Sequence, residues 1–200
     1  MNQAPSAIGA VCVFCGSASG RDPRHASDAA ALGRALAEAG VTMVYGGGGV
    51  GLMGAAARAA LSAGGRVIGV IPRFLQTPEL ALAEAELVTV ASMHERKAEM
   101  FARADGFAVL PGGVGTLEEA VELLSWARLN LHRKPIVFLD VAGYWTPLFE
   151  LIAHSVEEGF TPAAFRGLWR SVGRPQQVLP ALQEMAVESA RVGEAPLNLI

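Results

Sequence analysis

The sequence predicts an α/β fold, a doubly wound, Rossmann-like parallel sheet with helices on both faces. Short, continuously apolar runs, typical of strands buried on both faces, alternate with segments of helical spacing. Glycine-rich loops follow two of these runs, at residues 46–49 and 112–115, and ligands of such folds bind beyond the carboxyl ends of the strands. The 200 residues suffice for a single nucleotide-binding domain, with a core over about 10–189 and a tail over 190–200.

Each element has its own signal in the sequence. Apolar runs predict strands over 10–14, 41–45, 66–71, 87–90, 107–110 and 135–140. Helical spacing predicts helices over 26–39, from the first glycine loop to 63, and over 92–104, 116–131, 144–158 and 176–189. Gly40 and the pair at 64–65 end the first two helices, and Ser92 with Glu95 forms a capping box that places the third. Residues 73–86 have no clear pattern.

Composition limits the partners that the chain can have. Hydrophobic residues make up 52% and charged residues 18%, a balance that favours a homo-oligomer, most simply a homodimer. The net charge of −3 and the lack of a basic run argue against nucleic acid as a partner. No apolar run is long enough to span a membrane, and the first basic residue, Arg21, follows the apolar N-terminal stretch rather than preceding it as in a secretory signal. We therefore expect a cytoplasmic protein.

Neither a redox pair nor a metal site is expected. Cys12 and Cys15 form a C-x-x-C pattern, but in a strand positions i and i+3 point to opposite faces. The aspartates, which offer the hard oxygen ligands that many metals need, are scattered along the chain at Asp22, Asp28, Asp105 and Asp140. The sequence thus predicts no metal and no cofactor.

The first glycine loop allows three interpretations. Residues 45–54 match the G-x-G-x-x-G pattern twice, so a dinucleotide cofactor must be considered. However, the loop follows the second strand, and the next strand ends without an acid for a ribose; Arg73 would suit only the 2′-phosphate of NADP. The loop is otherwise a tight packing turn, or it is one wall of a nucleotide pocket, in which Gly46 and Gly47 contact the substrate. We favour the pocket wall.

The helix predicted over 92–104 carries two cations at its apolar face. Met93 and Met100 belong to the apolar stripe, Lys97 falls inside it, and Arg96 lies on its flank. A buried, unpaired cation is costly, so Lys97 must extend to solvent, pair with an acid or meet a ligand anion. We favour the ligand, and we expect His94 to be an exposed helix residue.

The segment 111–119 is the most informative in the chain. A strand that runs into a glycine-rich turn and then a helix presents unpaired backbone N–H groups to an anion. Glu119 follows one turn later, where it either completes a capping box with Thr116 or acts as a reactive acid, whereas Glu118 is expected to face elsewhere. The predicted buried face of this helix comprises Leu117, Ala120, Val121, Leu124 and Leu131. Glu119 would lie opposite, in a second strip with Leu123 and Trp126. Pairing of helices across a dimer would cover that strip and raise the pKa of Glu119 by partial burial.

Three motifs, at residues 45–54, 92–97 and 111–119, together resemble the Lonely Guy family of cytokinin-activating phosphoribohydrolases. The resemblance extends from about Val11 to the helix ending near Ser189, and the element at 15–20 differs from the family's usual pattern only at Ala18. It implies hydrolysis of the N-glycosidic bond of cytokinin riboside 5′-monophosphates, AMP or both, giving free base and ribose 5-phosphate. The family's catalytic Arg and Glu fall on Arg96 and Glu119.

The resemblance also suggests a role for each of these site residues. The turn and the first residues of its helix would hold the 5′-phosphate, namely Gly112, Gly113, Val114, Gly115 and Thr116, while Met93 and Lys97 would line the pocket. Glu119 would stabilise an oxocarbenium-like state and activate water, and Arg96 would fix Glu119. The family's frequent label "lysine decarboxylase" fits poorly, because Lys97 and Lys134, the two lysines of the chain, are poorly placed for a Schiff base. The rival interpretation is a non-catalytic nucleotide-binding protein.

Overall fold

The computed structural model describes residues 8–77 and 81–192, and they fold around one seven-stranded sheet. Its strand order is β4-β3-β2-β1-β5-β6-β7, and all neighbours are parallel. The strands are β1 Ala10–Phe14, β2 Thr42–Tyr45, β3 Val67–Pro72, β4 Glu86–Val90, β5 Gly106–Val109, β6 Ile136–Leu139 and β7 Arg170–Val172. The predicted parallel α/β sheet is confirmed. The edge strand β7 is absent from the sequence prediction, because three residues that include an Arg and a Ser give no apolar run.

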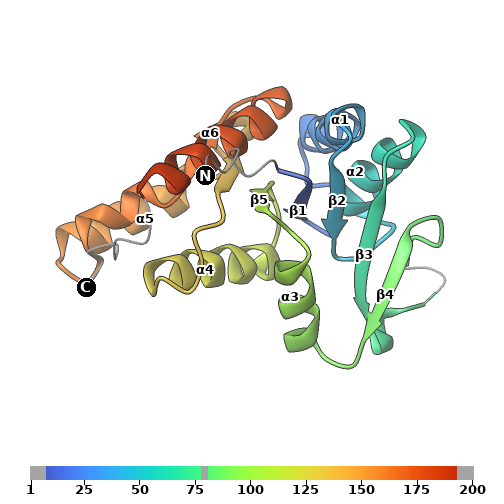
Figure 1. The fold of residues 1–200 in the computed structure, drawn as a ribbon, viewed down its shortest axis with the longest axis horizontal. Coiled ribbons are helices and arrows are strands. Elements are labelled where there is room, and N and C mark those ends of the chain that lie inside the picture. The colour runs from blue at the N-terminus through green and yellow to red at the C-terminus, as the bar shows by residue number, and fades with distance from the viewer. Residues whose placement is uncertain (1–7, 78–80, 193–200) are drawn as a thin grey trace, which may run out of the picture.

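Six α-helices cover the two faces of the sheet. They are α1 Pro23–Glu38, α2 Gly51–Ser62, α3 Met93–Ala102, α4 Val114–Arg128, α5 Thr146–Glu157 and α6 Val178–Val192. One apolar core joins the sheet to α1, α2 and α6, and the other joins it to α3, α4 and α5. Figure 1 shows α1 and α6 on one side of the strands and α3 and α4 on the other. Cys12 and Cys15 are free thiols that lie in opposite cores, as predicted. Among the described helices, none is long and apolar enough to cross a membrane.

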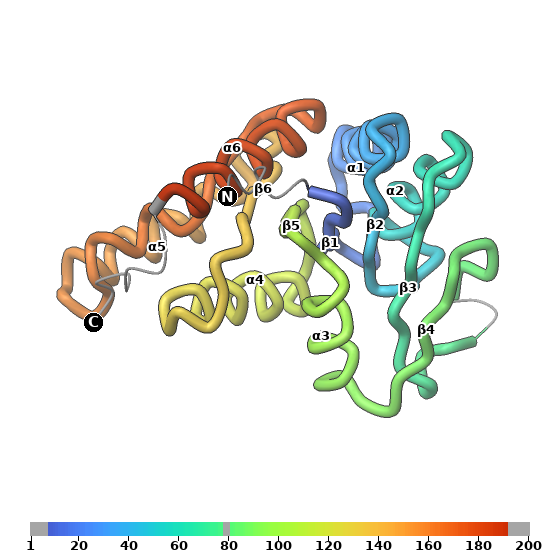
Figure 2. Tube along the Cα trace, in the orientation of Figure 1, coloured from blue at the N-terminus to red at the C-terminus, as the bar shows by residue number. Residues whose placement is uncertain are grey.

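The edge of the sheet toward which the chain adds successive strands changes between β1 and β5. From β1 the chain adds β2, β3 and β4 toward one edge, and from β5 it adds β6 and β7 toward the other. The trace in Figure 2 can be followed from β2 through β3 to β4 at the first of these edges. In such a sheet the loops that leave β1 and β5 diverge to opposite faces and open a crevice at their carboxyl ends. The glycine turn that begins α4 leaves β5 at this point.

The buried face predicted for α4 is wrong in part. Val121 is 50% exposed and Leu131 67% exposed, whereas Glu119 and Leu123 are buried. The residues that face the sheet share helical spacing: Thr116, Glu119, Ala120, Leu123, Leu124 and Ala127. The prediction chose the stripe with the bulkier apolar side chains, because it could not foresee that Arg96 would pair with Glu119 and permit its burial.

The layer of α1 and α2 depends on a close approach of two backbones. Gly33 of α1 lies against α2, and a Cβ built at this position would stand 2.1 Å from the carbonyl oxygen of Ala56. Ala29, Ala57 and Ala60 complete a contact of small, buried side chains. Since the obstacle is backbone, neither helix can accommodate a larger residue without moving away from its partner.

We therefore expect Gly33→Ala to destabilise the protein by about 1–3 kcal/mol through overpacking, despite the better helix propensity of alanine. Urea denaturation measures the change. The matched control is Gly173→Ala, because a Cβ at Gly173 meets no atom of the described residues within 4 Å and its φ is not positive. Equal stabilities of the two variants would contradict the tight contact between α1 and α2.

Candidate active site

A cavity of about 430 Å³ opens at the carboxyl ends of the central strands. Its walls come from the loops after β1, β2, β3 and β5 and from the first turns of α3 and α4. The lining residues that the sequence predicted are Gly46, Met93, Arg96, Gly113, Val114, Gly115, Thr116 and Glu119. The fold thus brings together eight of the predicted site residues from three separate segments of the chain.

The centre of this cavity is a buried ion pair. Arg96 Nη1 donates to Glu119 Oε1 at 2.7 Å, and the two side chains are 10% and 9% exposed. Arg96 Nε also donates to the carbonyl oxygen of Val70 on β3, at 3.2 Å. A Cβ at Gly46 would lie 2.0 Å from Arg96 Nη2, so the guanidinium occupies space that only a glycine leaves open. One side chain therefore joins β3, the loop after β2 and helix α4.

The environment of Glu119 alters its acidity. Burial raises its pKa above the ordinary value for a glutamate, and the nearby Arg96 guanidinium opposes this rise without cancelling it. The capping-box interpretation of Glu119 is wrong, because α4 begins at Val114 with Gly113 as its N-cap, two residues before the predicted start. The other predicted capping box is confirmed for its Ser92 half, since Ser92 Oγ accepts from the N–H of Glu95 at 3.1 Å. In that box the Glu95 carboxylate accepts from the N–H of Ala91 rather than that of Ser92.

The structure places Lys97 in an ion-pair cluster. Its Nζ lies 2.5 Å from a carboxylate oxygen of Glu118 and 3.0 Å from Glu122, and these acids raise its pKa although burial alone would lower it. Lys97 is not among the residues that line the cavity, whereas Glu118 is. The structure thus corrects the preference for a ligand contact at Lys97, and it corrects the expectation that Glu118 faces away.

The two glycine loops differ in what their helices offer a ligand. The N–H groups of Leu52 and Met53 at the start of α2 donate to the carbonyl oxygen of Gly16, at 3.0 and 3.3 Å. At α4 no side chain caps the first turn, and Gly113 to Thr116 line the cavity. Because a helix N-terminus with exposed N–H groups attracts anions, the start of α4 suits an anion better than the start of α2 does. These two N–H groups of α2 are therefore not free to bind the phosphates of a dinucleotide, which argues against the dinucleotide interpretation of the first loop.

Two predicted glycines lie outside the cavity lining. Gly47 has a φ of +77°, and its carbonyl oxygen accepts from the N–H of Leu82, so it shapes the loop. Gly112 borders an adjoining cavity of about 500 Å³ beside the loop after β1. A Cβ at Gly112 would lie 2.1 Å from Thr116 Oγ1. Gly47 is therefore needed for the backbone conformation of its loop, and Gly112 for the close packing of the turn on Thr116.

The sequence prediction missed part of the lining. These residues, apart from Glu118, are Cys15, Ser17, Ile71 and Leu75, whereas Gly48, Val50 and Met53 belong to the loop 45–54 that was predicted as a pocket wall. Most of them follow directly from the fold, since Cys15 and Ser17 come just after β1 and Ile71 lies near the end of β3. Leu75 had no signal, because it lies in the segment 73–86 that showed no pattern.

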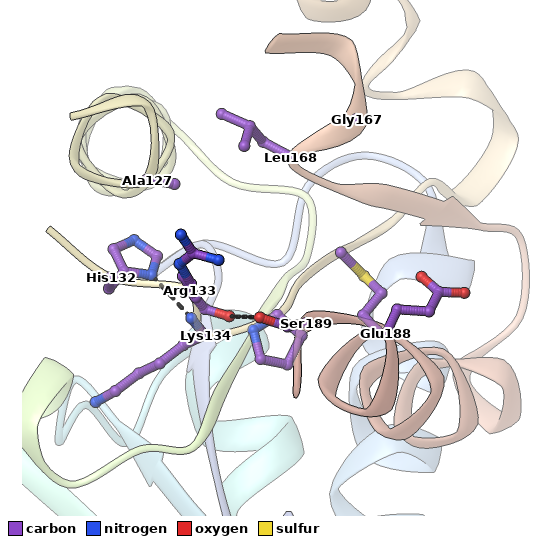
Figure 3. A pocket seen from close by; sticks show the side chains of 10 residues that line it. Ala127, His132, Arg133, Lys134, Gly167, Leu168, Glu188 and Ser189 are labelled. Atoms are coloured by element: carbon purple, nitrogen blue, oxygen red, sulfur yellow. Dashed lines mark hydrogen bonds between the residues drawn. The ribbon is translucent and has the colours of Figure 1, made fainter. Parts of the chain in front are cut away.

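A smaller cavity, of about 180 Å³, lies at the amino end of the sheet (Figure 3). Here the N–H of Lys134 donates to Nδ1 of His132, whose Nε2 bonds the carbonyl oxygen of Leu123, and Ser189 Oγ donates to the carbonyl oxygen of Arg133. Lys134 Nζ donates to the carbonyl oxygen of Phe101 at 2.7 Å. Burial lowers the pKa of His132. These polar groups connect backbone segments and are arranged for structure rather than for chemistry.

The fold and the site define a class, that of α/β proteins with a glycine-rich turn and a buried Arg–Glu pair at the carboxyl end of a parallel sheet. The profile of the family described as "possible lysine decarboxylase" matches residues 53–182, and the chain belongs to this family.

Curated relatives match over most of the chain. The cytokinin riboside 5′-monophosphate phosphoribohydrolase LOG7 of Arabidopsis thaliana is 42% identical over 189 residues, which cover 94% of this chain and 87% of the relative. The probable phosphoribohydrolase of the same kind, LOGL9, of Oryza sativa subsp. japonica is 46% identical over 87% of this chain and 77% of its own length. Among solved structures, the molybdenum cofactor carrier protein of Chlamydomonas reinhardtii superposes with a TM-score of 0.67 at 20% identity, over 90% of this chain and 98% of that one, which shows a shared fold.

The buried pair gives a prediction for stability and pH. Arg96→Met leaves Glu119 without its main cation, so its pKa rises further, and we expect a loss of about 3 kcal/mol at pH 8. A carboxyl whose pKa is raised by folding destabilises the native state as it ionises, so the loss should shrink as the pH falls toward 5. Denaturant titrations at the two pH values measure this, with Arg96→Lys as the charge-conserving control. A loss that does not depend on pH would contradict the pairing.

Proposed function

We propose that this protein hydrolyses the N-glycosidic bond of cytokinin riboside 5′-monophosphates, AMP or both, and releases the free base and ribose 5-phosphate. The observation that carries the proposal is the buried Arg96–Glu119 pair, which opens into a cavity beside an uncapped helix N-terminus. The relatives named as phosphoribohydrolases support the choice of substrate. A cavity of about 430 Å³ is in the range of small-molecule sites.

The proposed arrangement of the substrate follows from the two kinds of wall. The 5′-phosphate lies against the turn of Gly113, Gly115 and Thr116, where the N–H groups of α4 favour negative charge. The base extends toward the apolar wall, which is formed by Val50, Met53, Ile71, Leu75 and Met93. The ribose then lies between these ends, next to Glu119.

In the proposed mechanism Glu119 acts at the ribose. The departing base keeps the electron pair of the glycosidic bond and takes up a proton from solvent, and it leaves an oxocarbenium-like sugar, which a carboxylate stabilises by its charge. Glu119 also accepts a proton from the attacking water, and its raised pKa brings it closer to the working range of a general base. Arg96 holds one carboxylate oxygen in place, which fixes the direction of the other.

The decarboxylase that the family's description suggests does not fit this chain. Pyridoxal phosphate would need a lysine for its Schiff base. Lys97 is paired with Glu118 and Glu122, and Lys134 lies at the amino end of the sheet, where it bonds the carbonyl oxygen of Phe101. No step of the proposed reaction involves that cofactor.

We also propose that the protein is a cytoplasmic homodimer. One face of α4 presents Val114, Leu117 and Val121 to solvent, with exposed fractions of 82%, 37% and 50%. Their spacing of three and four residues makes a continuous apolar strip, of the kind that a second subunit covers. Both described cysteines are free thiols, which suits a reducing compartment.

The dimer is tested by Val121→Glu, which places a charge in the middle of the exposed strip. We expect the wild type to sediment as a dimer and the variant as a monomer, because an unpaired charge in an apolar interface is costly to desolvate. The control is Leu151→Glu, at a side chain that is 64% exposed on α5. A wild type that sediments as a monomer, or a dimer unchanged in V121E, would contradict this interface.

The catalytic role is tested by Glu119→Gln, which keeps an acceptor for Arg96 but removes the charge. We expect release of adenine from AMP, and of base from isopentenyl-AMP, to fall by a factor on the order of 10² to 10⁴. Chromatography of free base and assay of ribose 5-phosphate measure it. Glu122→Gln is the matched control, because it removes an acid one turn along α4 that does not line the cavity.

The same assay separates the hydrolase from its rival. A non-catalytic nucleotide-binding protein would bind AMP but release no base from either nucleotide. Hydrolysis by E119Q at the wild-type rate would remove Glu119 from the mechanism.

A further inference from the structure

Tyr144 reaches the phosphate-binding turn from outside the cavity. It follows the short 3₁₀ turn Val141–Gly143 after β6, and its hydroxyl donates a hydrogen bond to the carbonyl oxygen of Gly112. Tyr144 lines the adjoining cavity with Gly112 and Gly113, and it is not among the residues that line the cavity of Arg96 and Glu119. Its ring therefore lies on the side of the turn that faces the adjoining cavity.

The segment that presents Tyr144 has an unusual backbone. Ala142 has a φ of +55° and Gly143 a φ of +73°, and the first of these is unfavourable for a residue with a Cβ. Asp140 Oδ1 accepts from the N–H of Trp145 at 2.7 Å and holds the far end of the turn. The ring of Tyr144 packs edge-on against those of His25 and Trp145, with centroids 5.8 and 5.0 Å away. The hydroxyl is thus held in one position by a turn that adopts a costly conformation.

The orientation of one peptide group follows from this hydrogen bond. In a trans peptide the carbonyl and the N–H point in opposite directions. Tyr144 holds the carbonyl oxygen of Gly112 toward the adjoining cavity, so the N–H of the same peptide, on Gly113, points to the other side. Gly113 also lines the substrate cavity, together with the first residues of α4, and we infer that its N–H points there.

We propose that Tyr144 is a positioning residue for the phosphate site: its hydroxyl fixes the Gly112–Gly113 peptide so that the Gly113 N–H faces the substrate phosphate. The proposal rests on the proposed function, in that it places a phosphate at the start of α4. Two glycines in succession leave this peptide free to rotate, since neither residue has a Cβ to restrict it. The hydroxyl supplies the restriction that the sequence of the turn lacks.

The test is Tyr144→Phe, which removes the hydroxyl and keeps the ring against His25 and Trp145. Titration calorimetry with ribose 5-phosphate and with adenosine separates the phosphate from the nucleoside, and neither ligand requires turnover. We expect the affinity for ribose 5-phosphate to fall about tenfold, the effect of one lost hydrogen bond to a charged group, with adenosine affinity unchanged. With AMP as substrate, the KM should rise with a much smaller change in kcat.

Tyr45→Phe is the matched control, at the other tyrosine of the chain. Its hydroxyl is buried without a hydrogen-bond partner among the described residues, so its loss should leave both affinities unchanged. Unchanged ribose 5-phosphate affinity in Y144F, an equal loss for adenosine, or no binding of ribose 5-phosphate by the wild type would overturn the proposal. Wild-type binding of both ligands without release of adenine from AMP would overturn the hydrolase instead, and leave the comparison of Y144F with Y45F valid.

Discussion

The site depends on one interaction, the buried ion pair of Arg96 and Glu119. Removing two charges from water costs several kcal/mol for each ion, so such a pair adds little to stability and is retained for another reason. Three features of the fold position the two side chains of this ion pair. Ser92 caps α3 and sets the rotation at which Arg96 points inward, Gly46 leaves room for the guanidinium, and the early start of α4 turns Glu119 toward the sheet. Together these features place a carboxylate of raised pKa in a cavity.

Much of the fold could be predicted because its signals are local. Apolar runs located six of the seven strands, and the capping box at Ser92 located the start of α3 within one residue. The stripe on α4 could not be predicted in the same way. There the sequence offers two faces, and the choice between them depends on Arg96, which is 23 residues away in the chain. The prediction of a ligand contact at Lys97 was wrong for a similar reason, because its two acid partners lie on another helix.

The two glycine loops show how tertiary contacts separate sequences that look alike. Both follow a strand and open a helix, so local reasoning gives both the same affinity for phosphate. At α2, however, the carbonyl oxygen of Gly16 fills the anion position, and a Cβ at Gly51 would lie 2.3 Å from the backbone of Ser17. The glycines of the first loop thus allow the loop after β1 to pack on α2 and leave space for Arg96. The glycines of the second loop leave the N–H groups at the start of α4 without a side-chain cap.

The polarity of the cavity limits which molecules suit it. Arg96 has five N–H donors, and two of its bonds, to Val70 and Glu119, hold it in place. The α4 turn offers backbone N–H groups to an anion, while Leu75, Ile71 and Met93 give the cavity an apolar wall. A free phosphate would leave the apolar wall in water, and a free base would leave the cation and the N–H groups unused. A molecule that carries a phosphate at one end and an apolar group at the other satisfies both walls, and in the proposed arrangement the bond that joins its two parts lies beside Glu119.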